Sequence, residues 1–327
     1  MLGQTIPSGA TWVRFPRFVG DAVMLFPILR LLRWIGVGHI VVYGPRATVG
    51  LVEDSELADY AVPESEKPDI FGLSELLRRH EPERAICFPK TLRPPVAAWL
   101  AGVPERIGIS DGGGAIFNTL HAPFWSLSGP FVTRYWTALA KRWPDLPAPP
   151  FADYAPNTTV DKPKNAYICL LPRLGMSKGK PVEHWKNWPC GHFRGVAQRA
   201  RQSGLDVVVL GTTPEKEMGD AILDGHGRNL CGQTNLRQAA AWLQGAEAVV
   251  GGDSGLCHLA AACGAKTIAI FGPTDPTASA PWGPNVTVLK PQNLPCAPCL
   301  WRKRGCVMQE RECLNGITPE QVWKCLL

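Results

Sequence analysis

The chain has 327 residues, of which 45% are hydrophobic, and its formal net charge is +6. This length predicts two domains, and the apolar fraction is sufficient for two hydrophobic cores. The sequence has no uncharged apolar run of about 18 residues, which argues against a transmembrane helix, and its basic residues form no long tract of the kind that binds nucleic acid.

The N-terminal segment lacks the basic stretch and apolar core that are typical of a signal peptide, so we expect a cytoplasmic protein. Several arginines stand beside apolar helical stretches, as in the segment 30–34. This arrangement is compatible with an anionic substrate or a lipid surface, although a single arginine more often belongs to a solvated helix face.

The first half of the chain alternates between apolar strands and amphipathic helices. Strands are predicted at residues 11–15, 39–43, 84–88 and 106–109, and helices at 22–35, 73–79 and 95–101. The alternation predicts a doubly wound α/β domain. The glycine-rich stretch 111–114 is predicted to be a loop, because no helix suited to dinucleotide binding follows it.

Residues 144–163 contain six prolines and show little periodicity, which predicts a linker between domains. The alternation then restarts, with strands at 166–171 and 206–211 and helices at 193–202, 214–223, 236–244 and 316–326. We therefore predict an N-terminal domain over residues 1–150 and a C-terminal domain over residues 151–327.

The segment 247–284 carries the clearest pattern in the chain. An apolar strand at 247–250 runs through Gly251 and Gly252 into a small-residue helix at 255–263, and a second strand follows at 266–271. Asp253 and Ser254 precede the helix as candidate N-caps.

Ligands of open α/β sheets bind where the strands end, so residues 251–255 and the loop 272–275 are expected to share one edge. Close backbone approach at the glycines, the positive end of a helix and the Asp253 carboxylate together suit a nucleotide diphosphate. An ordinary capped turn explains the pattern equally well. His258 can face the same end, although a lone helix histidine is usually packed or capping.

Four of the eleven cysteines lie close together in a short basic segment: Cys296, Cys299, Cys306 and Cys313. In a reducing compartment this spacing favours a tetrahedral metal site of structural type, with zinc before iron. Four free thiols in a loop, or disulfides formed on handling, are the alternative.

The segment DSGLCHLAAA at 253–262, FGPTDP at 271–276 and WGP at 282–284 resemble glycosyltransferase family 9. These enzymes are the ADP-heptose:lipopolysaccharide heptosyltransferases and their relatives. The resemblance extends from about Arg14 to Val322. It implies a GT-B architecture, in which two doubly wound Rossmann-like domains face each other across a cleft, with the acceptor bound by the first and the donor by the second. The last helix of such folds often returns to the first domain.

The segment RFPRFVGDAVM at 14–24 resembles the N-terminal loop of the family, in which the aspartate after the glycine is the proposed catalytic base. The resemblance therefore implies this role for Asp21. An inverting transfer needs one carboxylate that takes the proton from the acceptor hydroxyl. Without the resemblance, Asp21 is more simply explained as a helix N-cap. The family implies no metal or other cofactor for the transfer.

The donor contacts implied by the resemblance lie in the second half. Lys186 belongs to a Lys-x-Trp-Pro motif that contacts the donor phosphates, and Glu215, with Glu217 as the competing candidate, is expected to bind the ribose. Asp253 is assigned to the hydroxyls of the transferred sugar, and backbone contacts to the diphosphate are assigned to Ser254, Gly255 and Leu256, joined by His258. The loop 171–180 departs from the family, and we expect Ser177, Lys178 or Lys180 to replace its usual phosphate contacts.

On the acceptor side, Lys90 and Arg93 are expected to bind an anionic glycolipid. The resulting prediction is an inverting transferase that moves a heptose from ADP-heptose to a lipopolysaccharide core acceptor, peripheral to the inner membrane. A protein or another glycan as acceptor, or a non-catalytic GT-B protein that binds nucleotide sugars, are the alternatives. An epimerase of the same fold would leave Asp21 unexplained.

Overall fold

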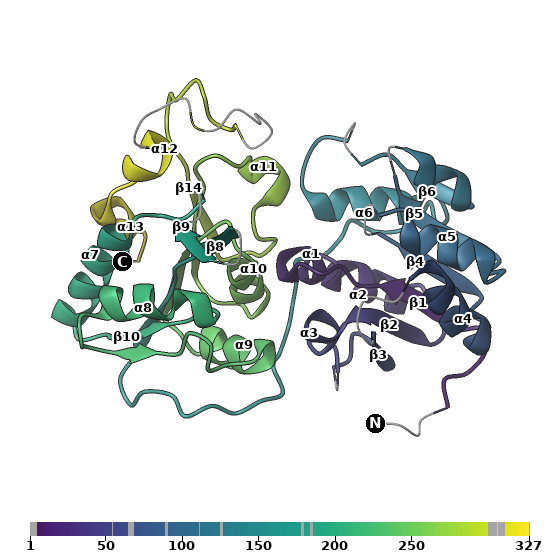
Figure 1. The fold of residues 1–327 in the computed structure, drawn as a ribbon, viewed down its shortest axis with the longest axis horizontal. Helices are drawn as coiled ribbons and strands as arrows, with labels where there is room; N and C mark the ends of the chain where they lie inside the picture. Colours follow the sequence, from purple (N-terminus) through teal and green to yellow (C-terminus); the bar gives the residue numbers. More distant parts are fainter. Residues whose placement is uncertain are drawn as a thin grey trace. The chain divides into compact units, whose positions relative to one another are not determined.

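The computed structural model describes residues 5–53, 55–64, 69–88, 91–110, 112–124, 127–177, 180–183, 186–299, 306 and 311–326. The chain divides into two compact units, Met1–Ala152 and Asp153–Leu327 (Figure 1). The division falls inside the proline-rich segment that we expected to be a linker. Of the helices that the structure describes, none has both the length and the apolar character needed to span a bilayer.

Unit 1 is built on a six-stranded parallel sheet in the order β3-β2-β1-β4-β5-β6. Its strands are β1 (Thr11–Arg14), β2 (Ile40–Pro45), β3 (Tyr60–Glu64), β4 (Arg84–Cys87), β5 (Glu105–Ile109) and β6 (Leu120–Ala122). The central strands are buried along their whole length, as both faces of a parallel sheet require. Their apolar runs are the reason why the sequence predicted them.

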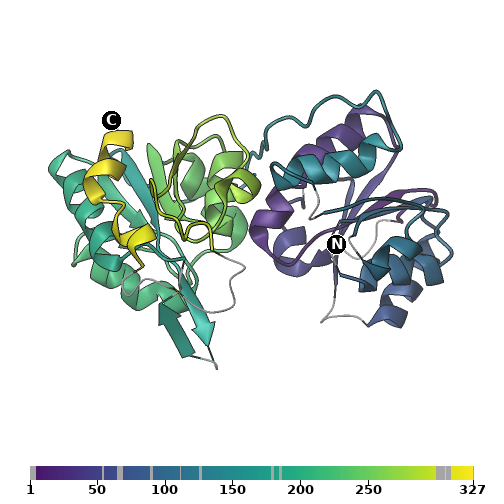
Figure 2. The ribbon, with the colours of Figure 1, turned by 90° about the horizontal axis from the view of Figure 1, so that it is seen from above.

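The helices of unit 1 cover both faces of this sheet (Figure 2). They are α1 (Val19–Val23), α2 (Phe26–Trp34), α3 (Arg46–Val49), α4 (Ile70–His80), α5 (Arg93–Leu100), the 3-10 turn η1 (Gly113–Phe117) and α6 (Phe131–Ala140). Helix α2 packs with α6, and α4 packs with α5. Of the predicted loop at 111–114, Gly113 and Gly114 lie inside η1 and residue 111 lies outside the described residues. The elements β3, β6 and α6 were not revealed by the sequence.

The single helix predicted at 22–35 is two helices in the structure. Helix α1 begins at Val19, and α2 carries Pro27 in its first turn. Proline lacks the N–H that a continuous helix would need there and is well tolerated at a helix start. Because α1 begins at Val19, Asp21 lies inside its first turn, and the N-cap is Phe18. The expectation that Asp21 opens the helix was therefore wrong in position.

Unit 2 repeats the same design with the order β11-β10-β7-β12-β13-β14. Its strands are β7 (Tyr167–Leu171), β10 (Asp206–Val209), β11 (Arg228–Asn229), β12 (Ala248–Gly252), β13 (Thr267–Ile270) and β14 (Val286–Leu289). A separate antiparallel hairpin, β8 (Leu174–Ser177) and β9 (Lys180–Glu183), follows β7. This hairpin occupies the loop that departs from the family pattern, and the sequence did not predict it.

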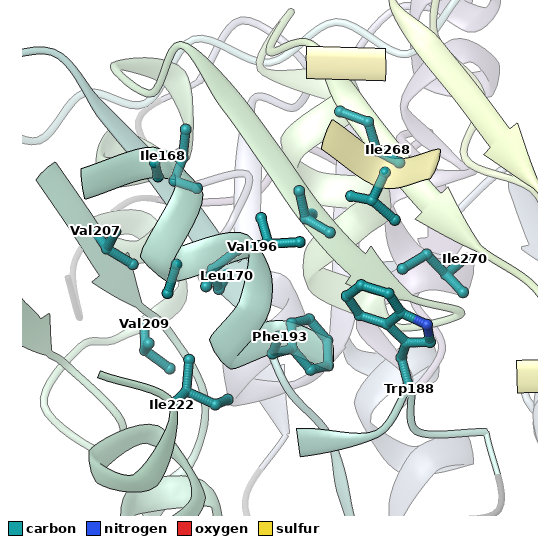
Figure 3. Packing of buried hydrophobic residues seen from close by; sticks show 14 of the residues in the cluster. Ile168, Leu170, Trp188, Phe193, Val196, Val207, Val209, Ile222, Ile268 and Ile270 are labelled. Carbon is teal, nitrogen blue, oxygen red and sulfur yellow. The ribbon is translucent and has the colours of Figure 1, made fainter. Parts of the chain in front are cut away.

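The helices of unit 2 are α7 (Cys190–Gln202), the 3-10 turn η2 (Thr213–Glu215), α8 (Lys216–Leu223), α9 (Leu236–Gln244), α10 (Gly255–Ala262), α11 (Pro276–Ser279), α12 (Glu312–Asn315) and α13 (Pro319–Leu326). Between α7 and the sheet lies a dense apolar core in which Trp188 and Phe193 pack against strand residues such as Leu170 and Ile270 (Figure 3). This core anchors the segment that leads into α7.

The last helix, α13, belongs to this core. Its Val322 and Trp323 are buried in the cluster, and Glu320 forms an ion pair with Arg199 of α7 at 2.5 Å. The Lys266 ammonium also donates to the carbonyl of Leu326 at 3.0 Å. The family resemblance implies that such a helix often returns to the first domain; these contacts pack α13 against unit 2.

Both sheets share the strand order in which the first and fourth strands of the unit lie side by side. At this pair the chain crosses to opposite faces, and open α/β sheets bind ligands beyond the carboxyl ends of such strands. In unit 1 the pair is β1 and β4, and in unit 2 it is β7 and β12. The topology therefore selects two edges, and most of the expected site residues follow these strands.

Candidate functional site

The edge of unit 2 is formed by the residues that follow β7, β12 and β13. Close backbone packing there depends on two glycines. A Cβ atom at Gly251 would lie 2.6 Å from the Cys257 sulfur, and one at Gly252 would lie 3.1 Å from the carbonyl oxygen of Lys186. Because Gly251 and Gly252 carry no side chain, the turn after β12 can pack closely against the segment before α7.

Lys186 and Asp253 meet at this edge. The Lys186 ammonium lies 2.6 Å from the Asp253 carboxylate, and the two side chains are 17% and 12% exposed. Coulombic attraction is stronger in such a partly buried position than in open water. The buried neighbour Trp188 fixes the lysine segment, because its indole N–H donates to the carbonyl of Ile317 at 2.8 Å. Two predicted donor residues therefore form one charged pair.

Helix α10 begins immediately after this pair. Its N-cap is Ser254, whose backbone is extended and whose side chain makes no capping hydrogen bond, and Gly255 and Leu256 follow as the first helical residues. Asp253 stands before the cap, so of the two candidates only Ser254 is the N-cap. The first N–H groups of a helix have no intrahelical acceptor and favour an anion.

Three buried polar atoms near this edge lack a hydrogen-bond partner among the described residues: Oγ of Ser254, Nδ1 of His258 and Oγ1 of Thr274. His258 is 6% exposed. Burial lowers the pKa of its imidazole from 6.5 to about 4, with Asp253 opposing the shift and Lys186 adding to it. The histidine is therefore neutral at pH 7 and lies close to the charged pair. Unsatisfied buried polar atoms are uncommon, and they are typical of positions where a ligand binds.

Arg173 is a member of this edge that sequence reasoning missed. Its guanidinium donates to the carbonyl oxygen of Asp253 at 2.6 Å, and its backbone N–H donates to Oδ1 of Asn187 at 2.8 Å. The one feature of the sequence that marks Arg173 is its position as the first charged residue after the buried strand β7, which the structure places next to β12. The residues expected to act in its place were Ser177, Lys178 and Lys180. Lys178 lies outside the described residues, as do the side chains of the other two.

Glu215 is buried at the end of η2, where its carboxylate accepts from the Thr212 N–H at 2.7 Å and from the Thr212 hydroxyl. This reciprocal capping box holds the turn after β10. Glu217, the competing candidate, is exposed on α8. One oxygen of Glu215 thus has a structural task, and its contact with a ribose stays a prediction.

At the edge of unit 1, Asp21 is half-buried in α1. Burial raises the pKa of the Tyr135 phenol well above its ordinary value, and the Asp21 charge adds to this shift, so the two groups lie close together. Arg93 is the first residue of α5 and is half-buried. Lys90 lies outside the described residues. A neighbouring cation, Arg106, binds the carbonyls of Phe117 and Val103 and so holds a loop.

The cysteine segment packs beside the donor edge. The Cys299 N–H donates to the carbonyl of Pro273 at 2.8 Å, and a Cβ atom at Gly272 would lie 3.1 Å from the Cys313 sulfur. Burial raises the pKa of Cys313 to about 11, and the charges of Cys299, Cys306 and Cys296 add to the shift. The four sulfurs therefore share one neighbourhood, although no three ligating side chains of the described residues stand in a metal-binding arrangement.

Comparison with known proteins decides the family. The model of glycosyltransferase family 9 (heptosyltransferase) matches residues 70–310. The chain belongs to glycosyltransferase family 9. It is 28% identical to lipopolysaccharide heptosyltransferase 2 of Escherichia coli K12 over 279 residues, which is 76% of each chain.

Solved structures agree with this family 9 membership in fold. The E. coli ADP-heptose lps heptosyltransferase II has 23% identity and a TM-score of 0.75, and the match covers 97% of both chains. The iron-containing dodecameric glycosyltransferase TibC of enterotoxigenic E. coli has 16% identity and a TM-score of 0.62, covering 99% of this chain and 76% of TibC. The fold is GT-B, as expected, and the family 9 chain is a glycosyltransferase.

The buried histidine of this family 9 chain gives a pH prediction. The pKa of His258 is lower in the folded chain than in the unfolded one, so the unfolded state binds more protons between pH 6.5 and 4 and stability is lost as the pH falls. Relative to His258→Gln, the wild type is expected to lose about 2 kcal/mol more unfolding free energy between about pH 7.5 and 5. Urea denaturation at both pH values measures this difference. Parallel losses in the two proteins would contradict a neutral buried imidazole.

Proposed function

We propose that this chain is an inverting heptosyltransferase that moves a heptose from ADP-heptose to a lipopolysaccharide core acceptor. The observation that carries the proposal is the cluster at the edge of unit 2, where Lys186, Asp253 and the start of α10 meet at the strand crossover. The relatives support the substrates, because curated proteins similar to this chain are named lipopolysaccharide heptosyltransferases.

In the proposed reaction, the Asp21 carboxylate takes the proton of the acceptor hydroxyl as that oxygen attacks the anomeric carbon of the heptose. The bond from this carbon to the diphosphate oxygen breaks with its electron pair, and ADP leaves with the added negative charge. Lys186 and the N–H groups of Gly255 and Leu256 stabilise the leaving diphosphate. The reaction inverts the anomeric configuration and balances without a cofactor.

The remaining contacts are assigned by position. Asp253 can accept hydrogen bonds from the heptose hydroxyls, and Glu215 follows β10, where a carboxylate can bridge the ribose hydroxyls. On the acceptor side, Arg93 lies after β4 at the edge of unit 1 and would bind an anionic group of the acceptor core, together with Lys90.

Nucleotide binding tests the donor assignment. Calorimetric titration with ADP, UDP, GDP and CDP is expected to show the tightest binding for ADP. A preference for another base would move the donor away from ADP-heptose. A complete lack of binding would contradict the proposed function.

We further propose that Cys296, Cys299, Cys306 and Cys313 hold a structural zinc or iron ion. Four thiols suit such a site in number and kind, and two of them, Cys299 and Cys313, lie beside the loop after β13. The transfer itself does not run through the metal, because a site closed by four sulfurs leaves no open position.

Metal analysis of the purified chain is expected to find about one zinc or iron ion per protein, the number that one four-thiolate site holds. Cys299→Ser is expected to lose the metal and lower the melting temperature, while Cys169→Ser, a buried cysteine elsewhere in unit 2, retains the metal. If the wild type contains no zinc or iron, and chelation leaves its melting temperature unchanged, the proposed metal site is contradicted.

For a lipid-linked acceptor we propose peripheral contact of unit 1 with the cytoplasmic face of the membrane. Leu92, Trp99 and Ile116 are 51%, 50% and 78% exposed, and Trp99 meets Phe117 edge-on at 5.5 Å, which joins α5 and η1 into one apolar surface. Trp99→Ala with Ile116→Ser is expected to reduce cosedimentation with anionic vesicles. Trp34→Ala, an exposed residue of α2, is the control, and equal binding of all three proteins would contradict the contact.

A further inference from the structure

The Lys186–Asp253 pair at the donor edge leaves little positive charge for a diphosphate. Lys186 is the expected phosphate-binding cation, but its ammonium lies 2.6 Å from the Asp253 carboxylate, so the two charges offset each other. The diphosphate of a nucleotide sugar carries about two negative charges at pH 7, since the first ionisation of each phosphate is complete. A site that binds it at this edge therefore requires positive charge beyond that of Lys186.

Arg173 supplies such a charge. It stands two residues after β7, and β7 pairs with β12 so that Leu171 lies opposite Gly251. Its guanidinium donates to a neutral acceptor, the carbonyl oxygen of Asp253. Of the described residues, no aspartate or glutamate forms an ion pair with Arg173. Among the side chains that the structure describes, its charge is thus not offset by a carboxylate in contact.

The guanidinium also reaches the start of α10. The carbonyl of Asp253 to which it donates directly precedes Ser254, the N-cap of the helix. Burial raises the pKa of the Cys257 thiol in the first turn to about 12, and the charge of Arg173 is among the influences that oppose this shift. Oγ of Ser254, Nδ1 of His258 and Oγ1 of Thr274 are buried polar atoms of the same edge that have no hydrogen-bond partner among the described residues. The Arg173 guanidinium, the start of α10 and these unsatisfied polar atoms thus lie at the same edge of unit 2.

We propose that Arg173 is the second cation of the donor site and binds the diphosphate of the nucleotide sugar directly. The inference rests on the proposed function and names the group that replaces the usual phosphate contacts of the atypical loop. A guanidinium has five N–H donors, and the bond to Asp253 uses one of them. The others remain for phosphate oxygens, which the planar fork binds in pairs.

The position of Arg173 is fixed before the donor arrives. Its backbone N–H is held by Asn187, which is 2% exposed and directly follows Lys186. The arginine side chain in turn holds the backbone of Asp253, whose carboxylate holds Lys186. The two cations are therefore tied to one turn, and the donor meets a preorganised site rather than two mobile side chains.

The test measures dissociation constants for ADP and for adenosine with the wild type, Arg173→Ala, Arg173→Lys and the control Arg194→Ala, an exposed residue of α7. Arg173→Ala is expected to weaken ADP binding by about 10- to 100-fold, the range for hydrogen bonds to charged groups, and to leave adenosine binding unchanged. Arg173→Lys keeps the charge but not the fork, and is expected to fall between the wild type and Arg173→Ala. Arg194→Ala is expected to match the wild type.

The outcomes separate the inference from the proposed function. Equal losses for ADP and adenosine would show that Arg173 only supports the fold of the edge, and unchanged ADP binding in Arg173→Ala would also overturn the inference. If Arg173→Ala does not fold, Arg173→Gln takes its place, because it removes the charge but keeps a polar side chain, and ADP binding equal to that of the wild type would overturn the inference. A wild type that binds no ADP would overturn the proposed function itself.

Discussion

Replacing Asp21 with asparagine is expected to lower kcat for heptose transfer by about 10²- to 10⁴-fold, the usual contribution of a positioned general base. The amide has nearly the shape of the carboxylate but cannot accept the proton of the acceptor hydroxyl. Asp21 lies in unit 1, and the expected donor contacts lie in unit 2. Affinity for ADP is therefore expected to stay within about twofold, a change of less than 0.5 kcal/mol.

The release of ADP under saturating donor and acceptor measures the rate, and calorimetry measures the affinity. Asp69→Asn is the matched control, because Asp69 caps α4 of the same unit through the Gly72 N–H at 2.7 Å and asparagine caps equally well. If Asp21→Asn keeps the wild-type rate, the half-buried carboxylate has only a structural role beside Tyr135.

Lys186→Ala is expected to have the second largest effect. Loss of its contact with the diphosphate should weaken ADP binding by about 10- to 100-fold, and loss of leaving-group stabilisation should lower kcat by about 10²-fold or more. The partly buried Asp253 carboxylate then also lacks its cation, which adds repulsion toward the donor phosphates.

The variant Asp253→Asn separates the effect on ADP affinity from the effect on the rate of transfer. It removes the negative charge that offsets Lys186, so ADP is expected to bind more tightly than to the wild type, while transfer slows because a contact with the heptose is lost. Calorimetry with ADP and the rate of ADP release give the two quantities. Weaker ADP binding in Asp253→Asn, or unchanged binding in Lys186→Ala, would contradict the proposed role of the pair.

Local sequence signals predicted much of the fold. Helix α9 was placed at its observed bounds, and the structure shows that Asn235 and Gln238 form a capping box at its start. The strands β12 and β13 and helix α10 were recognised from apolar runs that end in glycines. The break between α1 and α2 was missed because Pro27 fits inside a first helical turn, so the apolar pattern continues across it.

The site was predictable only in part, for a similar reason. The family motif placed Lys186 and Asp253 at one edge, but their direct pairing joins residues 67 positions apart and depends on the packing of Gly252 against the lysine backbone. Arg173 was overlooked because its role arises from the side-by-side order of β7 and β12, which local periodicity does not encode. The hairpin β8–β9 was missed because its strands are short and contain Gly175 and Pro181, residue types that are depleted in strands.

A direct transfer assay tests the central claim most simply. The purified chain is incubated with ADP-heptose and a lipopolysaccharide core acceptor that lacks the heptose, and both products are followed by mass spectrometry and NMR. We expect equal amounts of ADP and heptosylated acceptor, with the anomeric configuration inverted relative to the donor. Transfer from a different nucleotide sugar, with none from ADP-heptose, would contradict the account.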